Sequence, residues 1–130
     1  MAGIYIVIAD VSNVQFQKYT TARKQDYIDE GNEEIEDLAK RLGVEIEEIS
    51  SPIHYKIKRY AQNYVLSRFA EDLIGTNNTP IGEGDIYKDM FERSRYLMQD
   101  SRPDITPTMF NGDDETPTNR AVSWQVIHRA

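Results

Sequence analysis

The stretch that most constrains the fold is residues 51–75, SPIHYKIKRYAQNYVLSRFAEDLIG, which combines a helix start, a helix stop and a long apolar stripe. Ser51 and Pro52 predict the start, because a serine hydroxyl can accept from a free amide of the first turn and proline suits the first helical position. Gly75 predicts the end. The apolar residues recur at steps of three and four and then spread around the helix: Ile53, Ile57, Tyr60, Ala61, Tyr64, Leu66, Phe69, Ala70, Leu73 and Ile74. We therefore expect this helix at the centre of a small bundle.

A second helix is expected over residues 21–42, which carry one apolar face and an acidic remainder. Gly43, directly after Lys40 and Arg41, is typical of a helix end, because glycine accepts a left-handed conformation and cations suit the carboxyl end of the helix dipole. Gly31 lies in the middle of this helix, where glycine costs about 1 kcal/mol relative to alanine. We therefore expect another helix to approach closely at Gly31.

A third helix is expected over residues 85–100, with Asp85 as its cap. Residues 4–8 are rich in β-branched side chains and predict a short β-like segment. Residues 104–130 show no helical period and finish in an alternating run, and residues 108–130 are predicted to form an extended tail. The expected fold class is mainly α: a bundle of three or slightly more helices, with a body in residues 1–107 and an arm in residues 108–130.

Charge limits the kind of partner that the chain can bind. The formal net charge of -7 argues against a general nucleic-acid binder, because neutralising phosphates requires a clustered basic surface. The charge is also uneven, since residues 1–51 hold 11 acids against 5 bases, whereas residues 52–74 hold 4 bases against 2 acids. This asymmetry suits head-to-tail packing of like subunits, although solvated surface charge is the commoner explanation of such a pattern.

Several classes of chemistry find little support in the sequence. It contains no cysteine, which removes disulfides, thiolate catalysis and cysteine zinc sites. The longest apolar run, residues 4–9, is far shorter than the roughly 20 residues of a membrane span. The acids of residues 29–37 point around the outer arc of a helix, which favours a solvated or intersubunit face over a metal site. His54 and His128 would need carboxylates brought to them by folding to hold zinc. We therefore expect no catalytic residue, cofactor or metal.

Trp124 is the aromatic residue most suggestive of function. Tryptophan in an otherwise polar tail is a typical anchor at a protein interface, although packing back onto its own bundle is an equal alternative. With Val126 and Ile127 it forms an alternating run that could add to a sheet edge. The other aromatic residues fall at helical spacing and are expected in the core and in interfaces.

Three motifs carry a resemblance to a known family. They are YIDEGNEEI at residues 27–35, the stripe Ile57-x-x-Tyr60-Ala61-x-x-Tyr64-Val65-Leu66, and Tyr87-x-x-x-Phe91-x-x-x-Arg95 followed by Asp104-Ile105-Thr106-Pro107. In this order, over about residues 20–107, the chain resembles the head–tail connector proteins of tailed bacteriophages, also called adaptor or head-completion proteins. Its C-terminal extension is longer and its N-terminal segment more strand-like than in many relatives.

The resemblance implies a non-enzymatic structural protein, assembled in the host bacterial cytoplasm and located in the neck of the virion. Its partners would be the portal protein, further copies of itself in a ring that is commonly a dodecamer, and the next neck or tail protein. Double-stranded DNA would pass through the ring without specific binding, and no membrane is involved. The residues expected to bind partners are those of the arm and of two oppositely charged helices: Trp124, Val126, Ile127, Lys56, Arg59, Arg68, Glu33 and Glu34.

Two interpretations from other classes stay open. One is a small acidic phage or bacterial regulatory module that binds proteins as a monomer or dimer. The other is a hydrolase or metal enzyme with an unrecognised site, which would require acidic side chains that converge in the folded chain.

Overall fold

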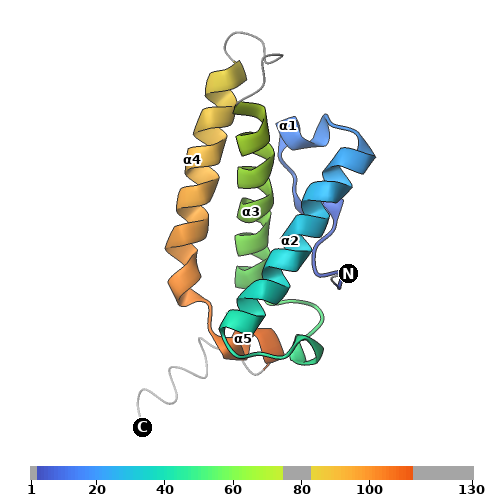
Figure 1. Ribbon diagram of the computed structural model, residues 1–130, viewed down its shortest axis with the longest axis vertical. Coiled ribbons are helices and arrows are strands. Elements are labelled where there is room, and N and C mark those ends of the chain that lie inside the picture. The colour runs from blue at the N-terminus through green and yellow to red at the C-terminus, as the bar shows by residue number, and fades with distance from the viewer. Residues whose placement is uncertain (1–2, 75–82, 113–130) are drawn as a thin grey trace.

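In the computed structural model, which describes residues 3–74 and 83–112, three long helices form a bundle that short helices flank (Figure 1). The helices are α1 (Val14–Gln17), α2 (Thr21–Arg41), α3 (Tyr55–Ile74), α4 (Glu83–Ser101) and α5 (Pro107–Asn111). Single turns of 3-10 helix are η1 (Ile8–Asp10), η2 (Ile46–Glu48) and η3 (Arg102–Asp104). The predicted mainly helical bundle is therefore confirmed.

Helix α3 is the central element of the bundle, as the sequence predicts. It packs against both α2 and α4, whereas α2 and α4 scarcely touch each other (Figure 1). Its buried residues are distributed around the helix: Ile57, Tyr60, Ala61, Val65, Ser67, Phe69, Ala70 and Leu73. A helix with apolar residues on several sides needs neighbours on several sides, and burying them stabilises the bundle at roughly 25 cal/mol per Å² of apolar surface.

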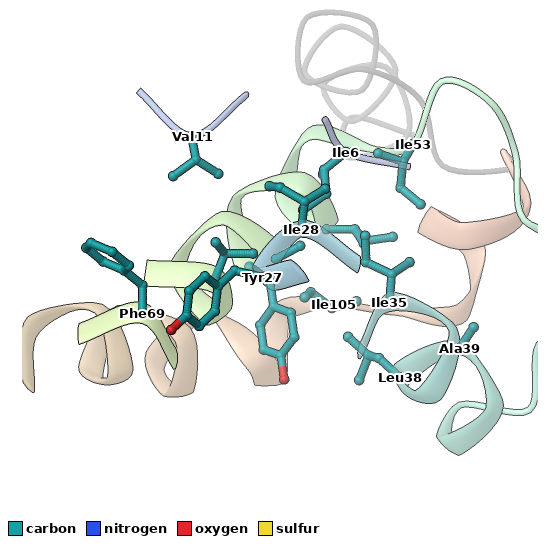
Figure 2. Close-up of a cluster of buried hydrophobic side chains, with 14 of the residues drawn as sticks. Ile6, Val11, Tyr27, Ile28, Ile35, Leu38, Ala39, Ile53, Phe69 and Ile105 are labelled. Atoms are coloured by element: carbon teal, nitrogen blue, oxygen red, sulfur yellow. The ribbon is translucent and has the colours of Figure 1, made fainter. Parts of the chain in front are cut away.

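Phe69 joins four helices through aromatic contacts. Its ring lies edge-to-face against those of Phe16, Tyr27 and Tyr87, with centroids 5.3, 5.7 and 6.0 Å away. Tyr19 makes a fourth such contact at 5.1 Å. This geometry places the positive edge of one ring against the negative face of another. Because Phe16, Tyr27 and Tyr87 belong to α1, α2 and α4, one buried side chain of α3 fixes their common meeting point. Figure 2 shows Phe69 and Tyr27 in the cluster of buried side chains.

Gly31 marks a close approach between α2 and its neighbours, which confirms the prediction for this glycine. A Cβ atom built there would lie 2.7 Å from Cγ2 of Val65 on α3 and 2.9 Å from Cδ1 of Ile6. Both distances are below ordinary van der Waals contact, so no side chain fits without movement. The N-terminal segment therefore takes part in this close contact together with α3.

Helix α2 begins and ends with capping interactions. The hydroxyl of Thr20 accepts a hydrogen bond from the backbone N–H of Arg23 at 3.3 Å. At the other end Gly43 has φ +80°, and the next N–H, from Val44, donates to the carbonyl of Ala39 at 2.8 Å. The predicted stop at Gly43 is confirmed, because this left-handed conformation is the one that glycine adopts most readily.

The predicted start of the central helix at Ser51 and Pro52 is wrong. These two residues form a bend joined by a cis peptide bond, and α3 begins at Tyr55. Ile53, between the bend and the helix, is turned into the core and is 8% exposed. The imidazole Nδ1 of His54 accepts from the N–H of Lys56 at 3.1 Å, so a histidine provides the first-turn acceptor that was expected from the serine.

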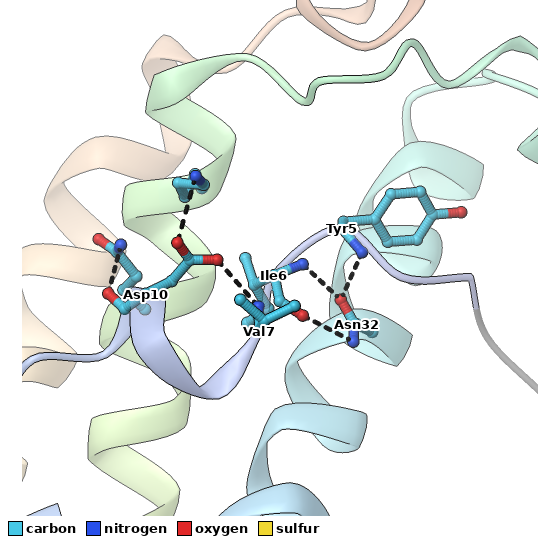
Figure 3. A network of polar contacts seen from close by, with 7 residues as sticks. Tyr5, Ile6, Val7, Asp10 and Asn32 are labelled. Carbon is cyan, nitrogen blue, oxygen red and sulfur yellow. Dashed lines mark hydrogen bonds and ion pairs between the residues drawn. The ribbon is translucent and has the colours of Figure 1, made fainter. Parts of the chain in front are cut away.

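The predicted β-like segment at residues 4–8 is also wrong, since the described residues contain no strand. The reason lies in the side chain of Asn32 on α2. Its Oδ1 accepts from the backbone N–H groups of Tyr5 and Ile6, each at 3.0 Å, and its Nδ2 donates to the carbonyl of Ile6 at 3.4 Å (Figure 3). One amide side chain thus satisfies the backbone groups that a neighbouring strand would otherwise pair.

The helical body extends beyond the boundary expected at residue 107. Helix α4 begins at Glu83, two residues before the predicted cap Asp85, and its C-terminal end leads through η3 into α5. Met109 and Phe110 in α5 are 5% and 0% exposed, and the carbonyl of Phe110 accepts from the N–H of Ser50 at 2.7 Å. Residues 108–112 of the predicted arm therefore belong to the body, and residues 113–130 lie outside the described residues.

Across the ranges 3–74 and 83–112, no helix combines the length and the apolar character needed to cross a bilayer.

Candidate functional site

The candidate site is a groove on the surface of the bundle, between α4 and the N-terminal segment, with α3 as its floor. It consists of two hollows of about 600 and 350 Å³, which adjoin because they share Asn13, Asn63, Leu66 and Leu97. We call it the α3–α4 groove. Its remaining lining residues come from three parts of the chain: Asp10, Val11, Ser12, Arg59, Gln62, Ile86, Asp89, Met90, Arg93, Ser94, Asp100 and Ser101.

The floor of the groove is the side of α3 that α2 leaves uncovered. Successive residues of an α-helix are about 100° apart, so the spacing of Arg59, Asn63 and Leu66 places them on one face. The α3 residues that meet α2, such as Ala61 and Arg68, lie roughly on the opposite face. Helix α4 and the N-terminal segment flank this face of α3 without filling the space above it, so a groove is left between them.

Apolar side chains from α4 form one wall. Ile86 is 45% exposed and Leu97 is 41% exposed, and both line the groove. Tyr87 and Ser94 on the same helix are buried. The apolar stripe of α4 is therefore wider than the contact with α3 requires, and its uncovered margin faces the groove. Half-exposed apolar walls of this kind are typical of surfaces that bind another polypeptide.

The opposite wall is held rigidly by polar contacts around Asp10 (Figure 3). One carboxylate oxygen of Asp10 accepts from the N–H of Val7 at 2.8 Å, and the other lies 3.4 Å from Nζ of Lys58 on α3. Its backbone carbonyl accepts from Nε2 of Gln62 at 2.8 Å. In addition, Nε2 of Gln17 donates to the carbonyl of Val11 at 2.6 Å. This wall is thus fixed to α3 before any partner arrives, which lowers the entropy lost on binding.

A separate hollow of about 370 Å³, outside the α3–α4 groove, lies between the N-terminal segment and α2. Ile4, 81% exposed, and Val7, 48% exposed, line it together with the acids Asp29 and Glu33. It is smaller than the α3–α4 groove and differs from it in having acids without bases among its lining residues.

Arg68 and Glu34, predicted as contacts between subunits, make contacts within the subunit instead. Nε of Arg68 lies 3.1 Å from a carboxylate oxygen of Glu30, and the guanidinium also pairs with Glu71. The hydrogen bond to Glu30 raises the pKa of Arg68 above its ordinary value. Glu34 accepts from the hydroxyl of Tyr60 at 2.8 Å, and burial together with this carboxylate raises the pKa of Tyr60. These charges hold α2 against α3.

The other predicted contact residues are not brought together in the structure. Arg59 lines the α3–α4 groove, whereas Glu33 is exposed on α2 and lines the smaller hollow. Lys56 is half-buried near the start of α3. The predicted docking residues of the arm lie outside the described residues: Trp124, Val126 and Ile127.

The groove offers chemistry for binding more than for catalysis. Its lining combines three acids and two arginines with apolar side chains, and the residues that its two hollows share are two asparagines and two leucines. Within the described part of the chain, no three histidine, cysteine or acidic side chains are grouped so that they could hold a metal ion. Sequence reasoning missed the groove, and the only signal for it was the excess width of the apolar stripe on α4, at Ile86 and Leu97.

Comparison of this chain with protein-family models, with curated proteins and with solved structures finds no match.

Proposed function

We propose that this chain is a non-enzymatic structural subunit that binds other proteins, and that it forms the ring joining head to tail in a tailed bacteriophage. The observation that carries the protein-binding part is the α3–α4 groove, whose α4 wall presents the half-exposed apolar side chains Ile86 and Leu97 and whose opposite wall is fixed to α3 by polar contacts. The connector part rests on the resemblance of the sequence motifs at residues 27–35, 57–66 and 87–95, which lie on α2, α3 and α4.

In the proposed ring the subunits contact one another head-to-tail, which requires two different surfaces on each subunit. Arg59 lies on the groove side of α3 and Glu33 on the exposed side of α2, so the two charges face away from each other in one subunit. Such a pair can meet only between subunits. Arg68 and Glu34 do not take part, because their charges are already engaged between α2 and α3.

The other proposed partners are the portal protein, bound by the arm through Trp124, Val126 and Ile127, and the next neck or tail protein. Double-stranded DNA passes through the ring without specific contacts, and the acidic composition favours this because repulsion keeps the duplex from adhering. The proposed location is the neck of the virion.

The experiment is to mix the purified full-length chain with the portal ring encoded in the same genome, and to measure mass by light scattering and shape by negative-stain microscopy. We expect a stoichiometric collar on the portal. Trp124→Asp should abolish the collar, whereas Gln125→Asp, its neighbour in the arm, should leave it. If the chain binds neither the portal nor the neighbouring neck proteins, the connector proposal is overturned.

A second candidate is a small regulatory module that binds proteins as a monomer or dimer. The observation that favours it is the pairing of Arg68 with Glu30 inside the chain, which leaves fewer free charges to join subunits. A monomer that binds neither portal nor neck proteins but does bind another protein through the groove would support this candidate.

A further inference from the structure

We propose that the α3–α4 groove binds residues 120–129 of the same molecule, RAVSWQVIHR, which lie beyond the described body. The proposal concerns the free subunit and needs neither a portal nor a second copy, so it can fail while the proposed function stands.

The groove has the length of a short extended peptide. Along α4 its lining runs from Ile86 to Ser101, which corresponds to about 22 Å at the rise of an α-helix. Six residues in an extended conformation span about 20 Å. The six residues 122–127 contain five apolar or neutral side chains around the only tryptophan of the chain, and they are the most apolar run beyond Gly112.

The alternation of the segment matches a groove with one apolar wall, formed by Ile86, Met90 and Leu97 of α4. In an extended chain, alternate side chains point to the same side, so Val122, Trp124 and Val126 would share one face. That face fits the half-exposed walls at Ile86 and Leu97. Burying an aromatic and two branched side chains there removes apolar surface on both partners from water.

The chain leaves the body close enough to reach the groove. Phe110, next to the end of α5, is fixed to Ser50 by a backbone hydrogen bond of 2.7 Å. Helix α5 packs at the end of the bundle where α4 finishes (Figure 1). From Gly112, the residues up to Trp124 can span about 40 Å when extended, which exceeds the length of the groove. Because the segment is tethered, its effective concentration at the groove is in the millimolar range, and even weak contacts suffice.

Charge gives the segment a direction in the groove. A chain that enters from the Ser101 end brings Arg120 near Asp100, which lies in the lining there. Residues 120–129 contain two arginines and no acid, whereas the groove lining contains three acids and two arginines. The pairing of Arg120 with Asp100 is at the exposed rim. We therefore expect it to influence the direction and register of the segment in the groove more than the affinity of binding.

The test uses Trp124 as the reporter, since it is the only tryptophan in the chain. In the full-length protein at low concentration, we expect the emission maximum of Trp124 to be shifted to the blue relative to solvent-exposed tryptophan. We also expect its fluorescence to be protected from quenching by acrylamide. Leu97→Glu in the groove should shift the emission to the red and abolish the protection. Tyr96→Glu, at a neighbouring position that is 64% exposed and outside the groove lining, is the matched control and should change neither quantity.

Two further measurements keep the proposal falsifiable. Ile86→Glu repeats the test at the other end of the groove, in case Leu97→Glu lowers helix content measured by circular dichroism. Asp100→Arg should weaken protection, and Asp100→Arg combined with Arg120→Asp should restore it. Solvent-exposed Trp124 in the unchanged protein, or equal effects of Leu97→Glu and Tyr96→Glu, would overturn the proposal. Protection that appears only at concentrations where the chain dimerises would also overturn it, because the occupant would then be a second copy.

Discussion

Asn32 carries the attachment of the N-terminal segment to α2. It is 3% exposed, and both of its side-chain groups bond to the backbone of Tyr5 and Ile6. A buried N–H group without a partner costs about 1 to 3 kcal/mol, so an amide side chain that satisfies two of them matters more than its size suggests.

We expect Asn32→Ala to lower the free energy of unfolding by about 1 to 3 kcal/mol, because the backbone N–H groups of Tyr5 and Ile6 lose their acceptor. Chemical denaturation measures the change, and hydrogen exchange should show lost protection at those two amides. Asn63→Ala is the control, since the Asn63 side chain bonds only to its own helix at Arg59. Unchanged exchange at Tyr5 and Ile6 would contradict this account.

At the scale of the elements, the N-terminal segment is also joined to α2 by Glu36. One oxygen of this carboxylate accepts from the N–H of Gly3 at 2.9 Å and from the hydroxyl of Tyr5 at 2.6 Å. Burial by itself would raise the pKa of Glu36, but these hydrogen bonds favour the charged form and the pKa is lowered below 4.5.

A lowered pKa in the folded state makes the attachment dependent on pH. The stabilisation from Glu36 is complete above pH 4.5 and is lost as the pH falls through the folded-state pKa, because the unfolded chain then binds the proton more readily. We expect Glu36→Gln to reduce the slope of stability against pH below 4.5, measured by thermal unfolding. Asp37→Asn, an exposed neighbour, is the control; an identical slope in both variants would show that Glu36 is not responsible.

The elements that sequence reasoning predicted best are those with long periodic patterns. The apolar periods of α2, α3 and α4 extend over five or more turns, so a few residues that break the pattern do not change the predicted helix. The short signals failed: residues 4–8 are held by the side chain of Asn32 on another helix, and the first-turn amide of Lys56 is satisfied by His54 in place of Ser51. Local sequence contains no information on which side chain will reach a backbone group from another helix.

At the scale of the whole molecule, the body ends at a different place from the one that the sequence indicated. Phe110 is fully buried although it follows Pro103 and Pro107, which read as the end of regular structure. The groove was likewise beyond sequence reasoning, because it depends on which side of α3 remains uncovered after α2, α4 and the N-terminal segment have packed. The candidate contact residues on α2 and α3 were chosen by charge alone, and charge does not reveal whether a partner lies inside the subunit, as for Arg68.

This boundary leads to a prediction for shortened chains. A chain ended after Gly112 should keep its helix content and unfold cooperatively, whereas one ended after Pro107 should lose about 3 to 5 kcal/mol or fail to fold, because it lacks Phe110 and Met109. Circular dichroism with urea titration distinguishes them. Phe110→Ala in the full chain is the matched variant, and equal stability of the two shortened chains would contradict the assignment of α5 to the body.

The contact at Gly31 has a consequence for how the chain avoids wrong structures. Shifting α2 along α3 by one turn, about 5.4 Å, would bring Tyr27 or Ile35 to the place where Val65 and Ile6 leave no room for a side chain. A slip of one turn in either direction therefore produces a clash, which favours the axial register that is observed. The close contact at Gly31 thus raises the energy of slipped compact states, which widens the energy gap between them and the native state.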